Sequence, residues 1–312
     1  MTNLICGVDV SSAALDVRLG RDGEARRFGN DAAGVAELAA FCKQHQVGLV
    51  AMEATGGYER LAFAVLWGAG VPAAIVNPRA VRRFAEAMGF LEKTDRIDSG
   101  IIAWFAEVKR IAPHRPAGEG QQRLAALVTR LRQLTELRTA QMNQRRLVTD
   151  TVALASFAEL LRLIARQIKA IGNQIAELID SDPLWQKLDL AWREIKGVAD
   201  RTVARLMAEL PEIGTLCGKA VSKLAGLAPI ANDSGKHNGP RSIRGGRAPV
   251  RSILFLVADI ARKYDPSLAD FRQRLLDQGK PKMVVRIALA HKLLVRLNAK
   301  ARDVRVQLAC PA

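Results

Sequence analysis

Four acidic residues in the first third of this 312-residue chain have the types and the setting of a divalent-metal site. Asp9 lies at the end of one short apolar run and Glu53 at the end of a later one, so each is expected at the end of a strand. Asp95 and Asp98 lie three residues apart where a helical pattern begins, so both would project from one face of that helix. If the two strands are neighbours, the four carboxylates can converge.

Such a cluster of like charges needs a cation to neutralise it, and hard carboxylate oxygens suit Mg²⁺ or Mn²⁺. Two such ions about 4 Å apart would activate a nucleophile and stabilise the leaving oxygen of a phosphodiester. Each acid taken singly has a plainer interpretation, as a solvated group at a strand end or, for Asp95, as a helix cap. Spacing alone leaves both interpretations open.

A second chemical candidate is a hydroxyl in the last third of the chain. Residues 231–247 form a loop rich in Gly, Ser, Asn and Arg, in which Ser234 stands between Asp233 and Gly235. Glycine lets a backbone approach a ligand closely, and guanidinium groups bind phosphate through paired donors. Asp-Ser-Gly is also an ordinary turn sequence, and a serine needs a base or a metal to become a nucleophile. His237 shares the loop but is not obviously paired with the serine.

Positive charge is concentrated in the same third. Residues 1–115 have a net charge of +1 and residues 116–185 of +2, whereas residues 186–312, with 24 basic and 11 acidic side chains, have +13. An excess of positive charge confined to the last third of the chain favours a polyanionic partner, and nucleic acid is the leading candidate. A membrane surface fits less well, because this segment lacks a basic helix with a broad aromatic and leucine face. A merely solvated basic surface is the alternative.

The basic residues expected to contact nucleic acid lie in three places. Lys196 lies in the turn of residues 195–198, which resembles a helix-hairpin-helix, where backbone N–H groups meet a phosphate. A plain glycine turn between packed helices fits that stretch nearly as well. The others follow Ser234 or lie near the C-terminus: Lys236, Arg241, Arg244, Arg247, Arg251, Lys282 and Arg286. A solvated helix face is the plainer interpretation of the C-terminal residues, but within the +13 segment a face that follows DNA or RNA phosphates is favoured.

The elements that must position these residues change along the chain. In residues 1–115, strand and helix signals alternate, which predicts an α/β domain with a mixed sheet. The predicted strands cover residues 4–10 and 15–19, which form a hairpin, and residues 48–52 and 73–76, and helical patterns surround residues 35–42 and 58–67.

The rest of the chain is predicted to be helical. Residues 116–185 have apolar side chains at spacings of three and four, with a heptad seam from Phe157 to Leu178. This pattern predicts two long helices, as an antiparallel hairpin or an oligomerisation coiled coil. Residues 186–312 are expected to be mostly helical, broken by the loop that holds Ser234. No stretch approaches the roughly 18 consecutive apolar residues of a membrane span, so we expect a cytoplasmic protein.

Four stretches of the first domain, taken together, resemble the DEDD transposases. They are GVDVS at residues 7–11, MEATGGYE at 52–59, NP at 77–78 with VRRFA at 81–85, and GFLEKTDRID at 89–98. This family comprises insertion-sequence recombinases related to the Piv DNA invertase, also called bridge recombinases. The resemblance implies a RuvC-like domain with an RNase H-type fold over residues 1–115, whose Asp9, Glu53, Asp95 and Asp98 bind Mg²⁺. Ser12 departs from the family, which usually has lysine there.

The loop around Ser234 is similar to the second domain of the same family. The matching stretches are GLAP at residues 226–229, DSG at 233–235, GGR at 245–247 and VR at 250–251. The resemblance implies that Ser234 is the nucleophile, with Ser242 a weaker candidate, and that it forms a covalent phosphoserine link to DNA. It also implies donor and target DNA and a bridge RNA as partners, and a homodimer or homotetramer with composite active sites. Three domains are then expected, at residues 1–115, 116–185 and 186–312.

Other functions are compatible with parts of the pattern. A RuvC-like nuclease or junction resolvase would use water as the attacking group and Ser234 only as a turn residue. A non-catalytic nucleic-acid-binding protein would need neither the acids nor the serine. A sugar-kinase-like phosphotransferase also has Asp-x-Ser after a first strand, but it should show glycine-rich adenosine-binding motifs in its later half and no concentrated basic tail. A tyrosine recombinase is disfavoured, because Tyr264 precedes His291 and lacks the expected arginine, histidine and arginine before it.

Overall fold

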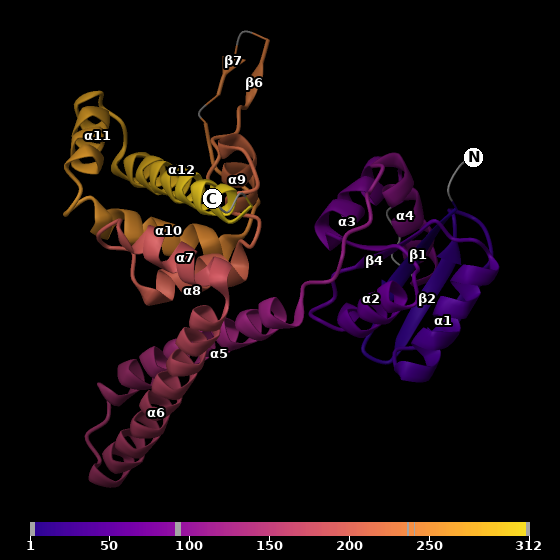
Figure 1. Ribbon diagram of the computed structural model, residues 1–312, viewed down its shortest axis with the longest axis horizontal. Helices are drawn as coiled ribbons and strands as arrows, with labels where there is room; N and C mark the ends of the chain where they lie inside the picture. The colour runs from indigo at the N-terminus through magenta and orange to yellow at the C-terminus, as the bar shows by residue number, and fades with distance from the viewer. Residues whose placement is uncertain (1–3, 91–94, 236, 240, 310–312) are drawn as a thin grey trace. The chain divides into compact units, whose positions relative to one another are not determined.

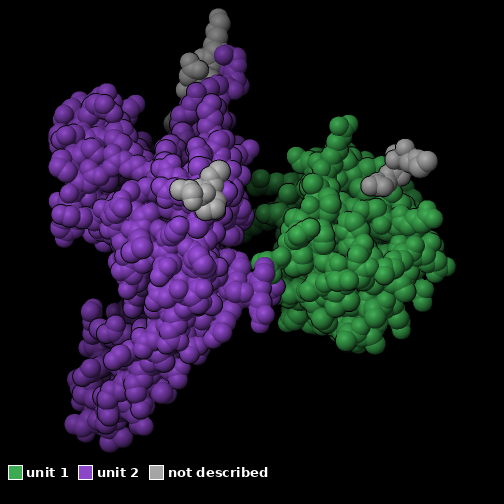
Figure 2. Space-filling model, in the orientation of Figure 1, with its two compact units in different colours: residues 1–117 green, residues 118–312 purple. Residues whose placement is uncertain are grey.

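The chain divides into two compact units, residues 1–117 and 118–312 (Figure 2). The computed structural model describes residues 4–90, 95–235, 237–239 and 241–309. Within this part, no helix is both long enough and apolar enough to cross a membrane.

Five strands form one mixed sheet in the N-terminal unit, in the order β3-β2-β1-β4-β5 (Figure 1). They are β1 (Ile5–Val10), β2 (Ala14–Leu19), β3 (Ala25–Gly29), β4 (Leu49–Glu53) and β5 (Ala73–Val76). The strands β1, β4 and β5 are parallel, whereas β2 runs antiparallel to both β1 and β3. The predicted hairpin and mixed sheet are confirmed. No sequence pattern predicts β3, because it is an edge strand with only Phe28 buried.

Helices cover both faces of this sheet. On one face, α1 (Ala32–Gln44) and α2 (Glu59–Gly68) share a core with Val8, Leu15 and Met52. On the other face, α3 (Pro78–Ala87) and α4 (Asp95–Val108) pack with Ala51 and Val76. A five-stranded mixed sheet between two helical layers is RNase H-like, as the resemblance implies. Adjacent strand residues such as Ala51 and Met52 belong to different cores, because side chains alternate along a strand.

Two long helices begin the C-terminal unit, as the apolar spacing predicts. They are α5 (Glu119–Arg145) and α6 (Thr151–Ser181), and they pack side by side (Figure 1). The heptad seam of α6 supplies the buried Ile164 and Ile175, and Ile175 joins the main core of this unit together with Ile179. The other end of the helix pair has exposed apolar side chains, including Leu147 and Val152.

The remaining helices pack around the C-terminal helix. They are α7 (Pro183–Arg193), α8 (Asp200–Glu209), α9 (Gly218–Ala225), α10 (Ala248–Ala261), α11 (Pro266–Asp277) and α12 (Lys282–Ala309). Leu289, Leu293 and Leu297 of α12 are fully buried, and Trp192 Nε1 of α7 donates to the Leu297 carbonyl at 2.9 Å. The mostly helical prediction for this region is confirmed. The serine-containing loop emerges from these packed helices.

Candidate active site

Asp9 and Glu53 lie at the same edge of the sheet on adjacent parallel strands. Val8 of β1 is paired in register with Met52 of β4, and each acid is the next residue of its strand. Because side chains alternate, the fully buried Val8 and Met52 face the core under α1 and α2, and the two acids face the opposite side. Both acids are half-buried there. The two strands are therefore neighbours, as convergence of the acids requires.

Helix α4 docks on this face through a glycine of β1. A Cβ on Gly7 would lie 1.9 Å from the Ser99 carbonyl oxygen and 2.6 Å from the Ala103 backbone nitrogen, so only glycine permits this approach. Ser99 directly follows Asp98, which is half-buried in the first turns of the helix. Helix α4 therefore brings Asp98 to the strand that also holds Asp9.

The donors on this face suit a hard divalent cation. Asp9, Glu53 and Asp98 offer carboxylate oxygens, which Mg²⁺ and Mn²⁺ prefer. Asp95 is the first residue of α4, and its side chain lies outside the described part of the chain. Among the described residues, no group of three or more His, Cys, Asp and Glu is arranged to hold a metal ion by itself. The four-acid site thus stays a prediction, and it needs Asp95 to complete it.

One amide side chain links the loops that follow the two acids. Asn30 Nδ2 donates to the Ser11 carbonyl at 2.8 Å and to the Tyr58 carbonyl at 3.1 Å. Ser11 lies just after β1 and Tyr58 just before α2, so Asn30 fixes the two loops at this edge of the sheet. Sequence reasoning missed Asn30, because its partners lie 19 and 28 residues away and no local pattern connects them.

A buried carboxylate holds the loop after Glu53. Glu59 Oε2 accepts hydrogen bonds from the backbone N–H groups of Thr55 and Gly57, both at 2.9 Å. Gly57 has a φ of 112°, a backbone that favours glycine. Glu59 lies in the MEATGGYE stretch quoted for the resemblance, but sequence reasoning assigned it no role. It determines how the chain leaves the strand that ends at Glu53.

Ser234 lies on an exposed hairpin of the C-terminal unit. The strand β6 (Asp233–Ser234) runs antiparallel to β7 (His237–Asn238), and Ser234 is paired with His237. Gly235, in the connecting turn, has a φ of 53°. The hairpin projects from the surrounding helices (Figure 1), and the Ser234 side chain is exposed. We call residues 230–242 the serine hairpin, and the Ser234 side chain on it is open to solvent.

Ser242, the weaker nucleophile candidate, lies at the base of the serine hairpin. Its backbone pairs with Ile230, whose N–H donates to the Ser242 carbonyl at 2.9 Å. This bridge closes the hairpin where it joins the helices. Ser234 is therefore the serine near the tip, whereas Ser242 belongs to the base.

Two family models match the chain over the regions that hold these groups. A DEDD transposase model of the IS110 type, described as "Transposase", matches residues 6–153, and the model "Transposase IS116/IS110/IS902 family" matches residues 191–273. The matched residues include all four acids and Ser234. The chain belongs to the IS110 family of transposases. It is thus a transposase-family enzyme that acts on DNA.

Several curated relatives resemble this IS110-family transposase along most of its length. The pilin gene-inverting proteins of Moraxella lacunata and Moraxella bovis are each 27% identical to it over 295 residues, which cover 89% of this chain and 88% of each relative. An uncharacterised 43.6 kDa protein of the insertion element IS110 from Streptomyces coelicolor is 28% identical over 221 residues, covering 67% of this chain and 53% of that protein. The chain is therefore similar to two proteins named for gene inversion and to a protein of an insertion element.

Several arginines of the transposase that were expected to bind nucleic acid make contacts within the protein. Arg241 pairs with Asp233 across the serine hairpin at 2.6 Å. The guanidinium carbon of Arg286 lies 4.0 Å from the centroid of the Phe255 ring, and Arg286 Nη2 lies 4.0 Å from Asp259 Oδ2. Arg247 and Arg251 also make contacts within the protein, at the base of the hairpin.

Three other basic candidates of the transposase have exposed side chains: Lys196, Arg244 and Lys282. Lys196 lies in the turn between α7 and α8, where Gly197 has a φ of 99° and packs so closely that a Cβ would lie 3.0 Å from the Ala261 backbone. That turn is thus in tight contact with α10, and Lys196 faces solvent beside it. Lys236 lies outside the described residues.

Proposed function

We propose that this transposase cuts and rejoins DNA at specific sites of an insertion sequence through a covalent bond between Ser234 and a DNA phosphate. Mg²⁺ or Mn²⁺ would be held by Asp9, Glu53, Asp95 and Asp98 in a RuvC-like domain. The observation that supports this proposal best is the position of Asp9 and Glu53 on one face of adjacent strands, onto which Gly7 admits the helix that holds Asp98.

The serine performs the exchange of bonds. A serine hydroxyl is a weak nucleophile, and a divalent cation, if held by the acids, would supply the charge that lowers the hydroxyl pKa. Ser234 Oγ attacks the phosphorus, so an Oγ–P bond forms while the bond from phosphorus to one deoxyribose oxygen breaks. The hydroxyl proton passes through solvent to that leaving oxygen. The number of phosphoester bonds is unchanged, so rejoining needs no external source of energy.

A direct test is to look for the phosphoserine. The full-length protein with its co-purified nucleic acid is incubated with Mg²⁺ and DNA containing the element ends, and mass spectrometry then locates any attached nucleotide. We expect the adduct on Ser234 in the wild type and in Ser242→Ala, and none in Ser234→Ala. Strand cleavage retained in Ser234→Ala without an adduct would instead indicate a nuclease that uses water. Function retained in Asp9→Ala would indicate a non-catalytic nucleic-acid-binding protein.

The proposed chemistry also requires the acids of one unit and the serine of the other to meet at one phosphate. We propose composite active sites in a homodimer or homotetramer, in which the serine comes from a second copy. Leu147 and Val152, 89% and 77% exposed at the end of the helix pair, favour this pair as a coiled-coil contact between copies.

Mixing two inactive variants tests the composite sites. Asp9→Ala and Ser234→Ala are each expected to be inactive alone. In a mixed dimer with composite sites, one site keeps both the acids and the serine, so activity should return to at most about half. If each copy builds its own complete site, every site in the mixture lacks one group and no activity returns.

A bridge RNA is the guide we propose for this transposase. The net charge of +13 over residues 186–312 supports a polyanionic partner but does not distinguish RNA from DNA. Treating the purified protein with RNase before adding DNA should abolish adduct formation at the element ends. Treatment with DNase, followed by its removal, should leave it unchanged.

A further inference from the structure

Arg247 binds the segment that follows the serine hairpin to the neighbouring helices. Its guanidinium makes paired bonds with Glu212, from Nη1 to Oε2 and from Nη2 to Oε1, both at 2.6 Å, and Nη1 also donates to the Glu209 carbonyl at 2.9 Å. Paired guanidinium–carboxylate bonds fix orientation as well as distance. The Arg247 N–H donates to the Leu224 carbonyl at 2.8 Å. The backbone and the side chain of one residue therefore hold this end from two directions.

Three glycines bring the segments before and after the hairpin into direct contact: Gly226 lies before it, and Gly245 and Gly246 lie after it. Gly226 follows α9 with a φ of 71°, and a Cβ there would lie 2.3 Å from both the Gly245 carbonyl oxygen and Arg251 Nη1. A Cβ on Gly246 would lie 2.2 Å from the Gly226 nitrogen. Arg251 Nη1 completes the contact by donating to the Gly245 carbonyl at 2.7 Å. The chain thus leaves for the hairpin and returns from it through one contact that admits no side chain.

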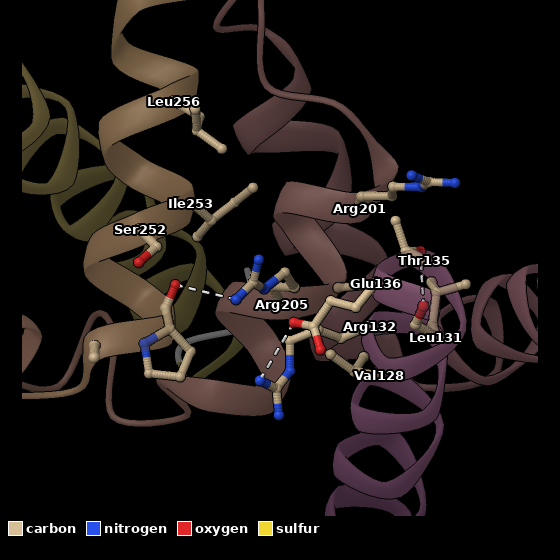
Figure 3. A pocket seen from close by; sticks show the side chains of 13 residues that line it. Val128, Leu131, Arg132, Thr135, Glu136, Arg201, Arg205, Ser252, Ile253 and Leu256 are labelled. Carbon is tan, nitrogen blue, oxygen red and sulfur yellow. Dashed lines mark hydrogen bonds and ion pairs between the residues drawn. The ribbon is translucent and has the colours of Figure 1, made fainter. Parts of the chain in front are cut away.

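A third arginine holds the helix that follows the hairpin. Arg205 of α8 donates from Nη2 to the carbonyl of Pro249, in the first turn of α10, at 3.2 Å (Figure 3). Both residues line a cavity of about 540 Å³ between α5, α8 and α10. Arg205 and Arg247 together tie the start of α10 to α8 and the segment after it.

Beyond this base, the serine hairpin depends on its own contacts. In the described part of the chain, the hydrogen bonds of residues 231–241 run to other residues of the hairpin, such as Gly239 N–H to the Asn232 carbonyl at 3.1 Å and Arg241 to Asp233. An isolated two-stranded hairpin is only marginally stable in water. The direction in which the hairpin presents Ser234 is therefore set at its base.

From this arrangement we propose that Glu212 is a positioning residue for Ser234. Through its paired bonds to Arg247, Glu212 fixes the base of the hairpin and so the approach of the serine to the scissile phosphate. Arg247 and Arg251 then act inside the protein rather than on DNA phosphates, unlike the exposed Arg244. This inference rests on the proposed function of Ser234.

The test separates positioning from DNA contact. For the full-length protein, the rate of Ser234 adduct formation at saturating DNA and the salt dependence of DNA affinity are measured for Glu212→Gln, Arg247→Lys and Arg244→Ala. We expect Glu212→Gln and Arg247→Lys to slow adduct formation about tenfold or more, with DNA affinity within about twofold and the salt slope unchanged. Arg244→Ala is the matched control for DNA contact: it should weaken binding and lower the slope of log K against log salt by about 1.

Two results would overturn the inference. One is an unchanged saturated rate in Glu212→Gln, and the other is a loss of salt slope in Arg247→Lys equal to that of Arg244→Ala. Thermal unfolding of each variant shows whether it folds. Should Glu212→Gln fail to fold, Glu212→Asp, which keeps the charge but is one methylene too short for the paired bonds, carries the same expectation. An adduct that persists in Ser234→Ala would contradict the proposed function itself, so the two failures are distinguishable.

Discussion

The carbonyl oxygen of Ser99 lies so close to Gly7 that a Cβ at residue 7 would be 1.9 Å from it. This contact joins α4, which begins with Asp95 and includes Asp98, to the strand that includes Asp9. An added Cβ would clash with backbone atoms of α4, so moving a flexible side chain could not relieve the clash. The position of the helix acids relative to the strand acids therefore depends on the absence of one methyl group.

Gly7→Ala should accordingly damage both stability and catalysis. The added methyl group must push α4 away, and overpacking of this kind lowers the free energy of unfolding by about 1–3 kcal/mol. We also expect the Mg²⁺-dependent cleavage rate to fall more than DNA affinity, because the acids are displaced while the basic surface is not. Urea unfolding and single-turnover cleavage measure the two effects. Gly68→Ala is the control, since a Cβ there meets nothing within 4 Å; equal unfolding midpoints for the two variants would contradict the packing argument.

Removal of the Asn30 amide should loosen the loops beside the acids. Asn30→Ala loses two hydrogen bonds to backbone carbonyls, a loss of about 1–2 kcal/mol in the free energy of unfolding. Asn30→Asp should be worse, because an ionised carboxylate can only accept and would face the Ser11 and Tyr58 carbonyls. Denaturant unfolding compares the two variants. If aspartate is tolerated better than alanine at neutral pH, Asn30 does not act as a donor to both loops.

Mg²⁺ should stabilise the protein only when the strand acids are intact. A cation at ten times its dissociation constant adds about 1.4 kcal/mol to the stability of the unit that binds it. We expect Mg²⁺ to raise the melting temperature of the wild type, and EDTA to reverse the change. In Asp9→Asn and Glu53→Gln the shift should vanish together with cleavage. A full Mg²⁺-dependent shift in both variants would place the cation elsewhere.

The parts of the structure that follow local patterns could be predicted from the sequence, and contacts between distant residues could not. Short apolar runs predicted β1 and β4, because buried parallel strands need uninterrupted apolar residues. The place of Arg247 in the basic, glycine-rich segment after Ser234 predicted a nucleic-acid contact, yet its carboxylate partner is Glu212, 35 residues away. A basic residue looks the same in sequence whether its partner is a phosphate or a distant acid.

Two neighbouring carboxyl groups near the base of the serine hairpin, Glu209 and Glu212, have pKa values shifted in opposite directions. Burial raises the pKa of Glu209, and the attraction of Arg205 does not offset it. Arg205 Nε and Glu209 Oε2 are 3.6 Å apart and both buried, too far apart for a hydrogen bond. Burial also acts to raise the pKa of Glu212, but hydrogen bonds from Arg247 and from its own backbone outweigh it, so that pKa is lowered.

These opposite shifts predict opposite pH effects of two similar substitutions. The lowered pKa of Glu212 means that its ionised form stabilises the fold above about pH 4.3, the unfolded value, and that this stability is lost as pH falls through the folded pKa. Glu212→Gln should thus lower the melting temperature at pH 7. Because this pair is more than a third exposed, the effect should stay below about 1 kcal/mol.

The raised pKa of Glu209 has the opposite effect on stability, because folding disfavours the ionised form of this carboxyl group. The free energy of unfolding therefore falls as pH rises from about 4.3 through the folded pKa. Glu209→Gln, which removes that charge, should raise the melting temperature at pH 7 and make no difference near pH 3, where the native carboxyl is already neutral. Calorimetric scans of the wild type and both variants across this range check the two signs. A lower melting temperature for Glu209→Gln at pH 7 would show that its ionised form is stabilised by the surrounding arginines after all.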